Sequence, residues 1–161
     1  MTKLFFALML FTQFTVYSHE QDPLHNREFH TSMSEVRNGV VARKVIPDLV
    51  RFKNGRIESG FLKRKFGFRH IRYRINKDSV YTDETGTEVR LLEAEAIATD
   101  EANVTVSIVF TVLEWDIDGV IRITKNDRLR RYYDLAGREK GGKPEKQKKR
   151  KETDDEENIS L

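Results

Sequence analysis

The stretch that most constrains the fold runs from Asn103 to Ile123 and reads NVTVSIVFTVLEWDIDGVIRI. From Val104 to Val112 every even-numbered position is apolar, which is the alternation of a β-strand with one buried face. An Asp118-Gly119 pair follows, and this dipeptide is a common hairpin turn. The sequence therefore predicts a β-hairpin at the centre of a β-sheet domain.

The register of this hairpin is predicted from its side chains. A two-residue loop at the Asp-Gly pair would set apolar residues against charged ones. A three-residue loop at 117–119, with its glycine left-handed, instead sets Trp115 opposite Ile121 and Leu113 opposite Ile123. We therefore predict the three-residue loop, with a bulge or bend that turns Trp115 and Leu113 inward.

A second hairpin is predicted over residues 48–59. Asn54-Gly55 is the typical two-residue turn between β-prone runs. Its register pairs Phe52 with Ile57 on one face, and an arginine with a glutamate on the other.

Further strands are predicted on both sides of these hairpins. Residues 65–77 alternate apolar and basic side chains, and Arg130 to Leu135 forms a last strand that ends at Gly137. Residues 88–100 are rich in helix-forming residues, but their alternation favours a strand with Leu92, Ala94 and Ala96 inward. The fold class is all-β: about seven or eight short strands in an antiparallel meander, closed as a lipocalin-like barrel or left as an open sandwich.

The two ends of the chain differ from this domain. Residues 1–18 carry Lys3, an apolar run and a cleavage pattern after Ser18, so they resemble a signal peptide and predict a secreted or periplasmic protein. The alternative, an uncleaved anchor, is disfavoured because a membrane span needs about 20 apolar residues. Residues 19–44 are predicted to form a flexible arm, and the β-meander to occupy 45–137. The alternative for the end of the arm is a first strand over Val36 to Val45, with Asn38-Gly39 as a turn signal.

The C-terminal segment 138–161 is predicted to be a disordered charged tail. Lysines and arginines dominate it as far as Lys151, and acidic residues follow from Asp154 to Glu157. Such a segment has too few apolar residues to bury a core. The chain has no cysteine, which excludes disulfides and cysteine-based metal sites.

The order of these motifs, over about residues 48–138, resembles small secreted bacterial lipocalin-like proteins. The matching residues are Phe52, Asn54-Gly55 and Ser59, then Gly67-Phe68, Tyr73, Leu92-Glu93-Ala94, Trp115, Asp118-Gly119 and Tyr133 to Gly137. The resemblance implies a β-meander. A small apolar ligand inside the sheet is then the leading functional hypothesis. Its expected lining is Phe52, Ile57, Tyr73, Phe110 and Trp115.

A basic stretch provides the competing hypothesis of an anion-binding surface. Its members are Lys63, Arg64, Lys65, Arg69, Arg72 and Arg74, with aromatic residues between them. The alternative is an ordinary solvated outer face of a sheet. For an exported protein the expected partner is an anionic lipid or polysaccharide, not nucleic acid.

Enzymatic chemistry has weak support in the sequence. No nucleophile–base set and no glycine-rich phosphate loop is recognisable, so we predict no enzyme, no cofactor and no metal site. One alternative is a copper enzyme. Cleavage after Ser18 makes His19 the N-terminal residue, whose amine and imidazole suit copper. The candidates for a second ligand are His25, His30 and His70.

Overall fold

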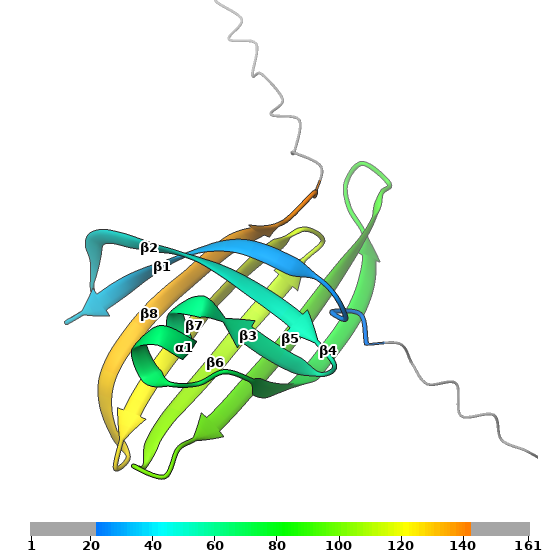
Figure 1. Ribbon diagram of the computed structural model, residues 1–161. Helices are drawn as coiled ribbons and strands as arrows, with labels where there is room; N and C mark the ends of the chain where they lie inside the picture. The colour runs from blue at the N-terminus through cyan, green and yellow to red at the C-terminus, as the bar shows by residue number, and fades with distance from the viewer. Residues whose placement is uncertain (1–21, 143–161) are drawn as a thin grey trace, which may run out of the picture.

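The computed structural model describes residues 22–142 and contains, within them, eight β-strands and one short helix. The strands are β1 (Glu28–Arg37), β2 (Val40–Lys53), β3 (Arg56–Ser59), β4 (Ile71–Thr82), β5 (Glu88–Thr99), β6 (Val104–Leu113), β7 (Asp116–Lys125) and β8 (Arg128–Glu139). Each strand pairs antiparallel with the next, and β8 pairs back with β1, so the hydrogen bonds form a closed ring (Figure 1). This confirms the predicted all-β antiparallel meander.

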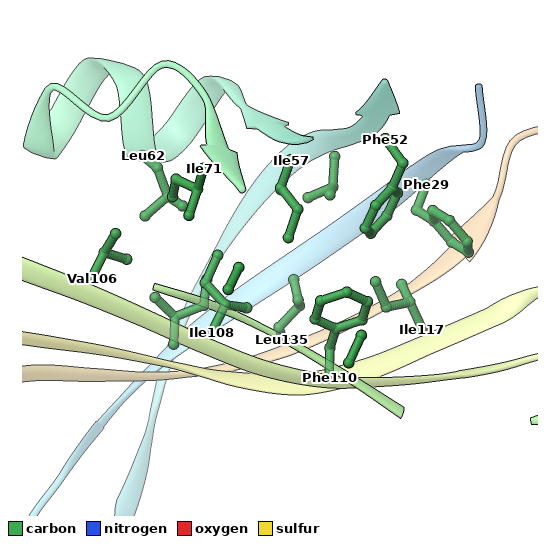
Figure 2. Packing of buried hydrophobic residues seen from close by; sticks show 14 of the residues in the cluster. Phe29, Phe52, Ile57, Leu62, Ile71, Val106, Ile108, Phe110, Ile117 and Leu135 are labelled. Atoms are coloured by element: carbon green, nitrogen blue, oxygen red, sulfur yellow. The ribbon is translucent and has the colours of Figure 1, made fainter. Parts of the chain in front are cut away.

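The core fills the inside of this ring. Along β6 the even-numbered residues all face inward, and the other strands contribute residues at the same alternation. Figure 2 shows these side chains meeting between the walls of the ring. Within the described part of the chain, no helix is long and apolar enough to cross a membrane.

Two predicted segments are confirmed closely. In the β2–β3 hairpin Phe52 pairs with Ile57, and both turn residues, Asn54 and Gly55, have positive φ angles of 52° and 68°. The ambiguous segment 88–100 is a strand, β5, and its predicted inward residues are buried.

The predicted loop of the central hairpin is wrong. Leu113 pairs with Asp116, so the turn consists of Glu114 and Trp115, and Glu114 has a positive φ of 51°. This earlier turn keeps the alternation of β6 unbroken, so no change of buried face is needed. As a result Leu113 and Trp115 face outward and are 41% and 43% exposed.

Gly119 lies inside β7, not at a turn. It pairs with Phe110 across the β6–β7 ladder. A Cβ atom on Gly119 would lie 2.5 Å from the carbonyl oxygen of Val109 and 2.8 Å from the Cβ of Phe110. The glycine therefore permits a close approach of two strands, which is the other common use of glycine in a sheet.

The flexible arm predicted at 19–44 is wrong for residues 28–37 and 40–44, which form β1 and the start of β2. The turn signal at Asn38-Gly39 is confirmed, and it separates these two strands. Phe29 and Met33 of β1 are fully buried, and β1 closes the ring between β2 and β8. The tail predicted from 138 is wrong for Arg138 and Glu139, which belong to β8. The proposed signal peptide and residues 143–161 lie outside the described residues.

Helix α1 (Gly60–Phe66) was not predicted, and the strand predicted from residue 65 begins only at Ile71. The Ser59 hydroxyl caps the helix by accepting a hydrogen bond from the Leu62 amide at 3.1 Å, and Gly67 ends it in a left-handed conformation. The Asp48 carboxylate accepts a further hydrogen bond from the Phe61 backbone amide at 2.9 Å. Buried Phe61 and Leu62 attach the helix to the core.

Residues 22–27 pack across the ends of several strands. Leu24 is fully buried, and the Asn26 amide donates to the Phe52 carbonyl at 2.8 Å. The Arg27 guanidinium bonds the Glu139 carboxylate at 2.6 Å and the Glu114 carbonyl, and lies over the ring of Phe29. One arginine thus joins the N-terminal turn to β8 and to the β6–β7 turn.

Candidate functional site

The five residues predicted to line a ligand cavity separate into two groups. Phe52, Ile57 and Phe110 lie together in the core, and Tyr73 lies half-buried at its edge. The Phe52 ring meets those of Tyr73 and Phe110 at centroid distances of 5.3 and 5.4 Å, and Figure 2 shows Phe52 and Phe110 facing one another. Trp115 lies on the outside, so it does not line the interior.

The interior is filled by side chains. The space left between them is about 10 Å³, roughly what one water molecule requires. Its walls are Met33, Val50, Phe52, Ile57, Ser59, Leu62, Ile108, Phe110, Ile117, Ile121 and Leu135. Sites for drug-sized molecules measure about 300–1,000 Å³, so an apolar ligand here would have to displace core side chains.

Tyr73 has a polar role at the edge of the core. Its hydroxyl donates a hydrogen bond to the Asp22 carboxylate. Burial raises the pKa of Tyr73, and the bond to Asp22 raises it further, so the phenol stays protonated at neutral pH. The hydroxyl thus holds the N-terminal turn against β4.

The six cations predicted as an anion-binding surface are all exposed, but some already have partners. Arg74 makes an ion pair with Glu95 at 2.5 Å across β4 and β5. Lys65 donates to the Tyr133 hydroxyl at 2.9 Å, and its ammonium lies over the rings of Phe61, Phe66 and Tyr133. These two side chains are held by the fold. Lys63, Arg64, Arg69 and Arg72 are the other four. Of these, the Arg64 guanidinium lies 2.9 Å from where a Cβ atom on Gly60 would be, as does the Asp48 carboxylate.

Arg72 belongs to a row of cations that the structure brings together. It lies opposite Arg56 across β3 and β4, and Arg56 lies opposite Lys53 across β2 and β3. We call these three residues the basic strip. All three are exposed, and none makes an ion pair with another described residue. Since neighbouring strands lie about 4.8 Å apart, the strip is about 10 Å long.

Sequence reasoning missed Lys53 and Arg56 as members of this surface. The predicted register of the Asn54-Gly55 hairpin already set them opposite one another. Glu58 lies two residues from Arg56 along β3, in the next row, where it pairs with Arg51 in the ladder and approaches the His70 Nδ1 at 3.2 Å.

The histidines do not gather in the described part of the chain. The His25 Nδ1 accepts a hydrogen bond from the Asn54 amide at 3.4 Å, and His30 lies exposed on β1. Within residues 22–142 no three His, Cys, Asp or Glu side chains are close enough to hold a metal ion. His19 lies outside these residues, so the copper hypothesis stays a prediction.

Comparison with known proteins does not assign this chain to a family. No protein-family model matches this chain, and no curated protein or solved structure gives a significant match. Its function has to be inferred from its own surfaces.

Proposed function

We propose that this protein is a non-enzymatic binding module that attaches to an extended polyanion through the basic strip. The observation that carries the proposal is the direct opposition of Lys53, Arg56 and Arg72 on three neighbouring strands, without a carboxylate partner among residues 22–142. Like charges placed opposite one another destabilise a sheet. An anionic ligand across the strip would remove that repulsion.

The strip differs from most of the outer surface in its length. Lys125 and Arg128 are also opposed cations, but they form a pair at a single turn, whereas the strip extends over three strands. Several cations at other outward positions have a carboxylate partner on the neighbouring strand: Arg74 with Glu95, Lys77 with Glu93, Arg90 with Asp78 and Arg138 with Asp116. The basic strip has no such partner in the described part of the chain. Two of its members are arginines, whose guanidinium groups bind carboxylate, sulfate or phosphate through two parallel hydrogen bonds.

The shape of the strip favours a chain-like ligand. Its charges follow a line across the wall of the ring, which suits the repeated acidic groups of a polysaccharide. The predicted export of the protein is consistent with such a partner. A lipocalin-type apolar ligand is less well supported, because it would need space that the core side chains occupy.

The test is binding of the full-length protein to a sulfated polysaccharide, with heparin as the probe, at low and at high salt. R56Q/R72Q should weaken binding by about tenfold at low salt, since an exposed charge pair is worth up to about 1 kcal/mol, and two contacts of about 0.7 kcal/mol each make a factor of ten. K125Q/R128Q is the matched control, because it removes the same charge from another opposed pair, at the β7–β8 turn.

The control variant should bind nearly as well as the unmodified protein, and salt should weaken binding of both. Equal losses in the two double variants would show that only net charge matters and would refute the strip as the site. Vesicles containing anionic lipid are a second arm. Strip-dependent binding to vesicles alone would reassign the partner to lipid headgroups.

A further inference from the structure

A second surface lies beside the β6–β7 turn and is unrelated to the basic strip. It is a groove of about 470 Å³, which we call the tryptophan groove. Its lining is Tyr81, Asp83, Val89, Leu113, Glu114, Trp115, Asp116 and Arg138. Tyr81, Leu113 and Trp115 are each more than 40% exposed, which is unusual for three large apolar side chains in one place.

The groove is acidic as well as aromatic. Arg138 binds Asp116 through two hydrogen bonds of 2.7 and 3.0 Å, so these two charges offset one another. Asp83 and Glu114 remain as excess negative charge. Hydrogen bonds from Thr85 and from nearby amides hold the pKa of Asp83 below its ordinary value, so it is ionised at neutral pH. Aromatic faces beside carboxylates are the surroundings that an ammonium or guanidinium group prefers.

The chain itself leads from this groove into a run of cations. The Glu139 amide donates to the Trp115 carbonyl at 2.7 Å, and a Cβ atom on Gly142 would lie 3.0 Å from the Cβ of Trp115. The next nine residues, 143–151, read KPEKQKKRK and contain six cations and one acid. Nine extended residues reach about 30 Å, enough to return along the groove.

We propose that the basic segment 143–151 of this chain occupies the tryptophan groove, with a cationic side chain over the Trp115 ring and others near Asp83 and Glu114. The attachment of the segment at Gly142 makes the contact intramolecular, with an effective concentration of order millimolar. The acidic residues 154–157 have the same sign as the groove and do not fit it. This inference does not depend on the proposed function.

Trp115 gives a direct readout, because it is the only tryptophan in the chain. Its fluorescence is measured in the full-length protein with acrylamide, an uncharged quencher that charge substitutions neither attract nor repel. One variant replaces all six cations of 143–151 with glutamine. The matched control replaces the four acidic residues 154–157 with their amides.

The acrylamide quenching constant of Trp115 should rise about threefold in the cation variant. An exposed cation–π contact covers the Trp115 ring in most but not all molecules, and removing the cations uncovers the ring in all of them. The control should match the unmodified protein. E114Q should also raise the constant, and salt should have the same effect.

Equal quenching of the unmodified protein and the cation variant at low salt would overturn the proposal. Protection of Trp115 that is lost on dilution would assign the segment to a second copy of the chain, and would overturn the intramolecular contact.

Discussion

Replacing Phe52 with alanine is the most direct test of the filled core. Phe52 is 1% exposed, and its ring contacts those of Phe29, Tyr73 and Phe110 at centroid distances of 5.3 to 5.6 Å. Removing the ring opens roughly 100 Å³, which at about 24 cal/mol per Å³ costs about 2 kcal/mol. The lost apolar burial adds about 2 kcal/mol. We expect the free energy of unfolding to fall by about 4 kcal/mol.

The assay is urea unfolding followed by far-ultraviolet circular dichroism, with the slope of the transition as a check on two-state behaviour. L129A is the control, because Leu129 is 60% exposed and its loss should change stability by less than about 0.5 kcal/mol. A loss below about 1 kcal/mol for F52A, with an unchanged slope, would refute the reasoning. Such a result would mean that the core side chains are loosely packed, and it would support the apolar-ligand hypothesis.

Three further predictions concern single contacts. G119A should lower the thermal midpoint through a loss of about 2 kcal/mol, since the new methyl meets backbone at 2.5 Å; an unchanged midpoint would contradict the close approach of β6 and β7. R27M should cost about 2 kcal/mol in urea unfolding by leaving the Glu139 carboxylate, only 14% exposed, without its cation. R37M is the control, because Arg37 is 67% exposed and its partner Glu35 keeps a second cation, Arg131. Stability should fall on acidification, because hydrogen bonds from Arg90 and Arg138 hold the pKa values of Asp78 and Asp116 below normal. The folded chain binds these protons less readily, so the contribution is present above a pH of about 4 and is lost as pH falls through the folded-state values. D78N/D116N should show a shallower fall of the thermal midpoint with pH, and an identical slope would count against this explanation.

The sequence predicted those elements whose alternation is regular and whose turn is local. The β2–β3 hairpin is the best case, because Asn54-Gly55 sets both the loop and the register. In β1 a buried threonine, Thr31, sits between Phe29 and Met33, so the apolar alternation was not recognised. Helix α1 has seven residues, too few for a helical period, and only its caps Ser59 and Gly67 indicated it.

The turn of the central hairpin was predicted wrongly for a different reason. A glycine before a β-prone run indicates a turn, but Gly119 is required by the approach of Val109 from the neighbouring strand. That contact is tertiary and has no local pattern. The basic strip shows the same limit. Lys53 and Arg56 share a hairpin whose register follows from its turn, whereas Arg72 joins them across a connection that contains α1.

The pairings between neighbouring strands of the ring differ in length. β3 has four residues and meets β4 through two residue pairs, whereas most neighbouring strands share long ladders. The β3–β4 pairing, which we call the seam, should therefore open locally more often than the other pairings. The amide hydrogens of Ile57 and Ile71 should exchange with solvent sooner than those of β6. The basic strip crosses the seam from β2 to β4. A polymer bound along the strip would link β2, β3 and β4 from the outside. Binding would therefore slow the exchange of amide hydrogens at the β3–β4 pairing.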